Sequence, residues 1–329
     1  MSNMTYAKAF DNTMRRPAAH QNRYTLYKGS VMSETTGSLP RLKDQIETMI
    51  GKKPHTANIL TAFTPILLEM KRLVEAGTCR ETDVSSVDSH RLAGGIPVSK
   101  QTQLLKPGEP WTDLARALIS AAMRGFPTLS GDLQSIEDAA MKGDILFERY
   151  FVSFPELDDT IPRDWAENLS VSPEALHVVL NSMLRTILEM KANTIVPALD
   201  DFTWDKGYCP LCGAFPQIAV IKDKISERWL SCSLCRHEWR FSRVLCPYCE
   251  HEGKEEGTTY FFIEGNDREA AFICEQCKRY VITLNRVSDL EDYDRDVVSM
   301  GLVHLDVIMQ EKGYIPVAFS DWNDFTKPS

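Results

Sequence analysis

No stretch of this sequence is apolar over the roughly 20 residues that a membrane-spanning helix requires. Arg15 and Arg16 are followed by no apolar run, so this region does not resemble a secretory signal. We therefore expect a cytoplasmic protein without membrane insertion. In that reducing compartment, closely spaced cysteines are metal ligands or redox groups and not structural disulfides.

The sequence also lacks an excess of basic residues. It contains 37 Lys and Arg against 46 Asp and Glu, a formal net charge of −9, and residues 204–286 hold 12 of each sign. A nucleic-acid-binding protein usually carries a basic domain or stripe, so we expect no nucleic-acid partner. A nucleic-acid-binding zinc ribbon stays an alternative because of one local cluster, Arg228, Arg236, Arg240 and Arg243.

The helical first part of the chain lacks a catalytic motif. His90 and His177 are isolated, and a lone histidine on a helix is more often structural than a ligand or a base. Acidic residues are scattered at the spacing of solvated helix faces. We therefore predict that the protein is not an enzyme, with no catalytic and no cofactor-binding residue.

What the sequence does contain is helical periodicity between residues 39 and 200. Apolar residues recur at helical spacing, which predicts helices over 39–50, 57–76, 111–124, 133–151 and 173–193. Pro65 should kink or split the second helix, and a break is expected near Gly143. Ser172 and Pro173 are a cap and a first helical residue. Residues 81–108 read as a loop.

After residue 200 the composition changes to short strand-like runs. They cover 217–221, 228–231, 238–242, 258–263, 270–273 and 280–284. Residues 289–292 are acidic and read as a linker, and a last helix is expected from about Asp294 to Lys312, ended by Gly313. We therefore predict a multidomain α+β protein with five units. These are a flexible arm (1–38), an all-α domain (39–200), two rubredoxin-like metal ribbons (204–244 and 245–288), and a C-terminal helix and tail (289–329).

Eight of the nine cysteines form four Cys-x-x-Cys pairs, in which two sulfurs can face one ion across a tight turn. The ninth, Cys79, reads as a small buried apolar residue. The gaps between the pairs are 19, 10 and 24 residues, and the two long gaps leave room for a hairpin. This spacing favours two sequential sites over an interleaved arrangement. The predicted ligands are Cys209, Cys212, Cys232 and Cys235 in site one, and Cys246, Cys249, Cys274 and Cys277 in site two.

Four-thiolate shells suit zinc or a single iron, so we predict two metal ions per chain, iron or alternatively zinc. A closed shell has no open position and cannot activate a water. The metals are either structural or act in redox or metal sensing, and a rubredoxin-like electron-transfer protein is a further alternative.

Gly213 permits a positive φ after the first pair. In the third turn Glu250 takes the position that glycine has in the first, so the third turn is less ideal. The second and fourth turns lack both proline and glycine.

The motifs of this region resemble those of the formate dehydrogenase accessory protein family, FdhE. They are Cys209-Pro-x-Cys-Gly213, Arg228-x-Leu230-x-Cys232-Ser233-x-Cys235, Trp239, Arg243 and Cys246-x-x-Cys249. The fourth pair and the final helix, with Gln310-Glu-Lys-Gly313-Tyr314, are similar too, so the resemblance covers about residues 205–316.

The resemblance implies a cytoplasmic protein with a helical domain and two rubredoxin-like modules. Members of the family are required to make active formate dehydrogenase and are not subunits of the finished enzyme. They are thought to contact its catalytic subunit before twin-arginine export, and iron has been associated with their cysteine sites. The eight paired cysteines would then be the metal ligands, and no catalytic residue carries over. The sequence leaves a homodimer open.

Overall fold

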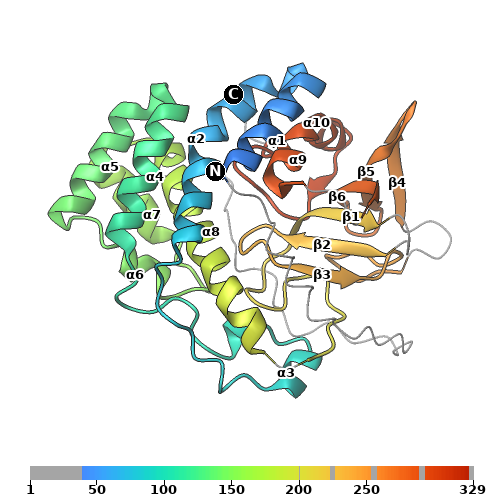
Figure 1. The fold of residues 1–329 in the computed structure, drawn as a ribbon, viewed down its shortest axis with the longest axis horizontal. Coiled ribbons are helices and arrows are strands. Elements are labelled where there is room, and N and C mark those ends of the chain that lie inside the picture. The colour runs from blue at the N-terminus through green and yellow to red at the C-terminus, as the bar shows by residue number, and fades with distance from the viewer. Residues whose placement is uncertain (1–38, 200, 223–226, 253–257, 289–292, 326–329) are drawn as a thin grey trace.

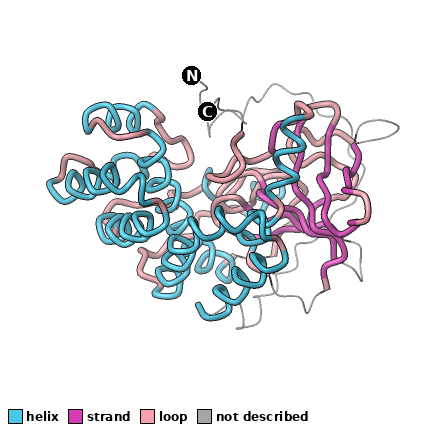
Figure 2. Tube along the Cα trace, turned by 90° about the horizontal axis from the view of Figure 1, so that it is seen from above, coloured by secondary structure: helices cyan, strands magenta, loops and turns pink. Residues whose placement is uncertain are grey.

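The computed structural model describes residues 39–199, 201–222, 227–252, 258–288 and 293–325. The predicted arm and the predicted acidic linker lie outside these residues. Helices form one side of the molecule and a twisted sheet forms the other (Figures 1 and 2). The mixed fold class predicted from the sequence, with helices first and a β-rich region with two cysteine clusters after them, is confirmed.

Between residues 39 and 199 the helical layer contains eight α-helices. They are α1 (Leu39–Lys52), α2 (Ala57–Ala76), α3 (Ser89–Ala93), α4 (Trp111–Gly125), α5 (Ser130–Lys142), α6 (Phe147–Phe151), α7 (Thr160–Leu169) and α8 (Pro173–Ala198). The helices α3 and α7 were not predicted. The expected break occurs at Gly143, whose φ of 84° ends α5. The helix α2 continues through Pro65, so of the kink or split predicted there the split does not occur.

The helix α8 lies at the centre of this layer. Ser172 caps it by accepting a hydrogen bond of 3.3 Å from the Ala175 amide, and Pro173 occupies the first turn, as the sequence predicts. It packs against α2, α4, α5 and α7, which makes it the axis of the helical core. A buried ion pair, 2.5 Å between Lys191 Nζ and Glu109 Oε1, joins it to the loop that precedes α4.

The predicted strands are all present. They are β1 (Pro216–Lys222), β2 (Arg228–Cys232), β3 (Glu238–Phe241), β4 (Thr258–Ile263), β5 (Asn266–Cys274) and β6 (Arg279–Val287). Their order in the sheet is β3-β2-β1-β6-β5-β4. Each expected ribbon is thus a three-stranded antiparallel unit, and the parallel pairing of β1 with β6 joins the two units into one sheet. The division into five units stays a prediction.

The segment predicted as one last helix forms two, α9 (Arg295–Gly301) and α10 (Val303–Glu311), followed by the short strand β7 (Ile315–Pro316). The helices meet at Leu302, which is buried in a second core cluster beneath β1, β5 and β6. They lie between α1 and the sheet (Figure 1). Within the described residues, no helix is both long enough and apolar enough to cross a membrane.

Candidate metal centres

The structure brings the eight paired cysteines together in the two predicted groups. One contains Cys209, Cys212, Cys232 and Cys235, and the other contains Cys246, Cys249, Cys274 and Cys277. Within each group all sulfur atoms lie within 4.8 Å of one another. The first pair of each group precedes a strand, and the second pair forms the turn after the next strand, so each site closes one three-stranded unit. The ninth, Cys79, belongs to neither group and is half-buried, whereas the sequence predicted a buried residue.

The four turns share one backbone geometry, although only one contains glycine. The residue after the second cysteine of each pair has a positive φ: 83° at Gly213, 59° at Arg236, 56° at Glu250 and 55° at Lys278. The expected difference between a well-formed first turn and poorer partner turns is therefore absent. Backbone hydrogen bonds within the turns, such as Glu250 N to Cys246 O at 2.9 Å, hold non-glycine residues in this region.

Site one is enclosed by the helical layer. Its four cysteines are at most 2% exposed. The amides of Val98 and Ser99 donate to the carbonyls of Pro210 and Leu211 at 2.9 and 2.8 Å, and the Ser99 hydroxyl donates to Cys212 O at 3.0 Å. These two residues belong to a short 3-10 helix, Val98–Lys100, inside the segment predicted to be a loop. Site one is thus built jointly by the sheet and a connection that lies over 100 residues away in the sequence.

The helix α8 touches site one directly. Arg185 Nε donates a hydrogen bond of 3.1 Å to the carbonyl of Ser233, between the two cysteines of the second pair. Arg185 and Arg236 both bind the buried carboxylate of Asp296, at 2.6 and 2.5 Å. Arg236 directly follows the ligand Cys235, and Asp296 lies in the first turn of α9. This ion cluster therefore connects the turn, α8 and α9.

Site two is more open to solvent. Cys246 and Cys274 are buried, whereas Cys249 and Cys277 are only half-buried. Tyr248 stands between the two cysteines of the third pair in the sequence. The guanidinium of Arg279 lies 4.0 Å from the centroid of its ring. The two sites therefore differ in access, which the similar spacing of their cysteines did not predict.

The two sites are also in contact with each other. Gly207, two residues before Cys209, approaches the backbone of Pro247 so closely that a Cβ atom there would lie 1.9 Å from the Pro247 carbonyl oxygen. The rings of Phe215 and Tyr248 are 5.0 Å apart. A side chain at position 207 would push the first turn of site two away from site one.

The donor set fits a tetrahedral ion. Four sulfurs at about 2.3 Å from a zinc ion are about 3.8 Å apart. Sulfur pairs are 3.3 Å (Cys212–Cys232) and 3.5 Å (Cys209–Cys235) apart in site one, and two pairs are 3.7 Å apart in site two. Amides also face the sulfurs: Leu234 N donates to Cys232 Sγ and Tyr248 N to Cys246 Sγ, both at 3.4 Å. Such bonds reduce the charge on thiolate ligands.

The thiols of each site cannot all ionise on their own. Hydrogen bonds from Cys246 and Cys277 lower the pKa of Cys249 to about 2, whereas the neighbouring sulfurs Cys246 and Cys249 raise the pKa of Cys277 far above its usual range. In site one, burial and neighbouring thiols raise the pKa of Cys209 and Cys235. A cation is needed to hold four thiolates together, so metal binding at either site would release protons and weaken as the pH falls.

The four arginines of the predicted basic cluster do not form an exposed patch. Arg228 is fully buried, Arg236 takes part in the ion cluster, and Arg240 pairs with Glu227 at 2.8 Å. Arg243 is exposed. The arginine cluster had kept nucleic-acid binding as an alternative. Its members therefore form internal contacts and surface ion pairs, and they do not form a basic surface.

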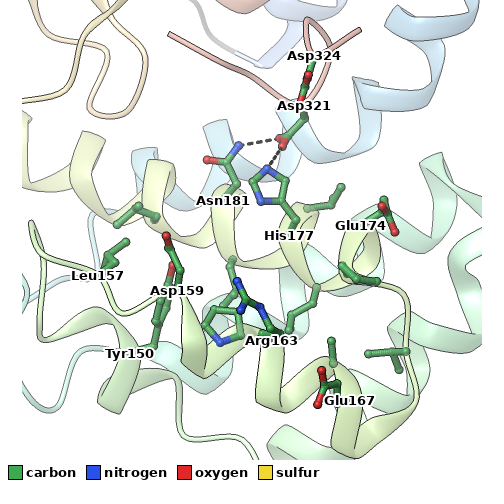
Figure 3. Close-up of a pocket in the computed structure, with 18 of the residues that line it drawn as sticks. Tyr150, Leu157, Asp159, Arg163, Glu167, Glu174, His177, Asn181, Asp321 and Asp324 are labelled. Carbon is green, nitrogen blue, oxygen red and sulfur yellow. Dashed lines mark hydrogen bonds and ion pairs between the residues drawn. The ribbon is translucent and has the colours of Figure 1, made fainter. Parts of the chain in front are cut away.

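A groove of about 890 Å³ lies between α7, α8 and the segment 320–324 (Figure 3). Apolar side chains, among them Leu176 and Leu184, line it together with charged groups. His177 Nε2 lies 3.0 Å from Asp321 Oδ1, and Asn181 donates to the other carboxylate oxygen at 2.8 Å. The sequence treated His177 as structural; the structure places it in the lining of the groove, in contact with Asp321.

The fold and the sites define a class of protein: a helical layer joined to one sheet that carries two four-cysteine sites. A family model described as "FdhE, central domain" matches residues 208–243, which include site one. A "Protein FdhE homolog" from Aquifex aeolicus is 31% identical over 156 residues, 45% of this chain and 52% of that protein, so the match spans about half of its length. "Protein FdhE" from Escherichia coli K12 is 27% identical over 274 residues, 81% of each chain.

The crystal structure of the FdhE protein from Pseudomonas aeruginosa shares the fold. It matches with a TM-score of 0.56 at 18% identity, over 89% of this chain and 98% of that one. These findings confirm the resemblance that the cysteine motifs predicted: over most of its length the chain is similar to FdhE proteins.

Proposed function

We propose that this protein is an accessory protein for the maturation of formate dehydrogenase and acts in the cytoplasm without being an enzyme. The observation that carries the proposal is the similarity to FdhE proteins, which extends over 81% of the chain in the Escherichia coli comparison and so is not confined to the cysteine region. The resemblance to that family implies a role in the formation of active formate dehydrogenase.

We also propose that each site holds one metal ion, iron or zinc, through its four cysteines. The sulfur separations and the amides that face the sulfurs support this assignment. Site one would stabilise the junction between the sheet and α8, because its turns are bound by Ser99 and Arg185. Metal analysis with a visible spectrum after anaerobic purification tests the assignment: two ions per chain are expected, and fewer than two contradicts it.

The partner in this proposal is the catalytic subunit of formate dehydrogenase, and the groove beside α8 is the surface we propose for the contact. Asp159, Glu167, Glu174, Asp321 and Asp324 line it against one arginine, Arg163, and the histidine paired with Asp321. Its charge therefore complements an apolar segment that carries lysine or arginine. Leu184 lines the groove. The residue after it, Arg185, contacts the turn of site one. The helix α8 therefore adjoins both the groove and site one.

Two measurements test this function. Cells that lack the protein should lose formate dehydrogenase activity, and the wild-type chain should restore it and co-purify with the catalytic subunit. The proposal fails if the Cys209→Ser and Cys246→Ser variants still restore formate dehydrogenase activity and still co-purify with the catalytic subunit. For the groove, Glu167→Lys with Glu174→Lys should reduce co-purification. Glu47→Lys is the matched control, because Glu47 is exposed on α1 outside the groove. Equal binding by the wild type, the double variant and the Glu47→Lys control would contradict the groove assignment. It would leave the proposed role in maturation standing.

A second function, electron transfer of the rubredoxin type, is favoured by one observation, the partial exposure of Cys249 and Cys277. It requires iron at site two. A visible spectrum that bleaches reversibly on reduction would support it, and a colourless zinc protein purified without air would exclude it.

A further inference from the structure

Arg228, in β2, is a fully buried cation with few partners. Its guanidinium carbon lies 5.1 Å from the ring centroid of Phe241 and 4.6 Å from that of Phe272. Nη2 donates one hydrogen bond of 2.5 Å to the carbonyl of Leu245, whereas Nε and Nη1 have no hydrogen-bond partner. Within the described parts of the chain, this guanidinium forms no ion pair with a carboxylate.

This arrangement keeps a positive charge inside the sheet. Burial lowers the pKa of Arg228 to about 10, and a group with that pKa is still a cation at neutral pH. An isolated charge is costly to remove from water unless an opposite charge lies near it. The two aromatic rings attract the cation, but they carry no net charge. The site therefore calls for a nearby anion.

The hydrogen bond of Arg228 points to where that anion would form. Leu245, which accepts it, directly precedes Cys246, the first predicted ligand of site two. The Tyr260 hydroxyl and, after it, the Cys246 sulfur are among the neighbouring groups that favour the charged form of Arg228. Four thiolates around a divalent ion carry a net charge of −2. At site two this charge would be partly shielded from solvent, because Cys246 and Cys274 are buried.

We propose that Arg228 is the counter-charge of the metal centre at site two. It is a positioning residue and not a ligand: it holds the segment Leu245–Cys246 and offsets the negative charge of the four-thiolate complex. This inference rests on the proposed metal binding at site two. It accounts for a buried cation that otherwise has no ionic partner among the described residues.

The test uses the full-length chain with Co²⁺ as the probe, because thiolate-to-cobalt absorption bands report binding. Arg228→Met fills the space between the two rings without a charge, and Arg228→Lys keeps the charge. Arg240→Met is the matched control, since Arg240 lies on the neighbouring strand and pairs with Glu227 nearer the surface. Each protein is titrated with Co²⁺ against a chelator of known affinity, and the Cys246→Ser variant identifies the bands of site two.

Arg228→Met should weaken cobalt binding at site two by about 10- to 100-fold, the usual effect of removing a group that supports metal ligands. Its thiolate-to-cobalt bands should move to lower energy, because the thiolates lose a neighbouring positive charge. Arg228→Lys should recover most of the affinity, and Arg240→Met should match the wild type. If Arg228→Met does not fold by circular dichroism, Arg228→Gln provides the same comparison.

Wild-type affinity and unchanged bands in Arg228→Met would overturn the inference and leave Arg228 as a packing residue. A wild-type protein without cobalt bands at site two would overturn the metal-binding proposal, and this inference with it. The two failures are therefore distinguishable.

Discussion

Replacing Asp296 with alanine tests how the sheet is attached to the helical layer. The side chain of Asp296 is fully buried, and its carboxylate binds Arg185 at 2.6 Å, Arg236 at 2.5 Å and the Gln217 amide at 3.2 Å. Burial opposes its ionisation, but Arg185 and Arg236 together hold the pKa of Asp296 below its usual value. The carboxylate is therefore charged in the folded protein and is shared by the buried guanidinium of Arg185 and the partly buried guanidinium of Arg236.

Removal of one partner from a buried ion pair typically costs about 3–5 kcal/mol, because the remaining charge is left without compensation. Arg236 would keep Asp294 and Glu189, whereas Arg185 would lose its only carboxylate among the described residues. We therefore expect Asp296→Ala to lower the free energy of unfolding by about 3 kcal/mol, at the lower end of that range. Glu69→Ala is the control. Its pair with Arg72 is on the surface, and its removal should cost about 0.5 kcal/mol or less.

Urea denaturation of the metal-loaded proteins, followed by circular dichroism, measures both changes. Asp296→Ala should also lose the metal of site one faster, because the turn that contains Ser233 is held through Arg185. A loss below about 1 kcal/mol, comparable to that of Glu69→Ala, would refute the conclusion that this cluster anchors the sheet.

Three further outcomes are expected. A chelator should remove the metal of site two before that of site one, because Cys249 and Cys277 are half-buried; release of both ions in a single phase would contradict this. Lys278→Gly should raise the free energy of unfolding by up to about 1 kcal/mol, since glycine adopts the φ of 55° without steric cost; lower stability in urea would count against strain at this turn. Ser172→Ala should lower the urea midpoint by the equivalent of about 1 kcal/mol through loss of the α8 cap, and an unchanged midpoint would show that the cap contributes nothing.

Local sequence patterns determined a large part of the fold. The start of α8 follows from Ser172 and Pro173, which act within a single turn of chain. The positions of the strands follow from short apolar runs between the cysteine pairs. The grouping of the cysteines was also predictable, because a gap of 19 or 24 residues fits a hairpin that returns the chain to the same ion. Each of these features depends on contacts close in the sequence.

Local patterns failed where a longer-range contact overrides them. The sequence suggested that Pro65 would kink or split α2, but the helix continues through it and packs against α4 and α8. It also ranked the four cysteine turns by their glycine and proline content. In the structure Arg236, Glu250 and Lys278 adopt the same left-handed conformation as Gly213, because the hydrogen bonds of the turn compensate for the steric cost.

The sequence by itself thus determined which residues can bind metal, since spacing within and between the cysteine pairs is a local property. Only the tertiary structure decided what surrounds each site. It joined the two units through β1 and β6, covered site one with Ser99 and α8, and left Cys249 and Cys277 partly exposed. It also buried Arg228, which the sequence showed only as part of a basic cluster. These features depend on residues that are distant in the chain and meet only when the sheet packs on the helical layer.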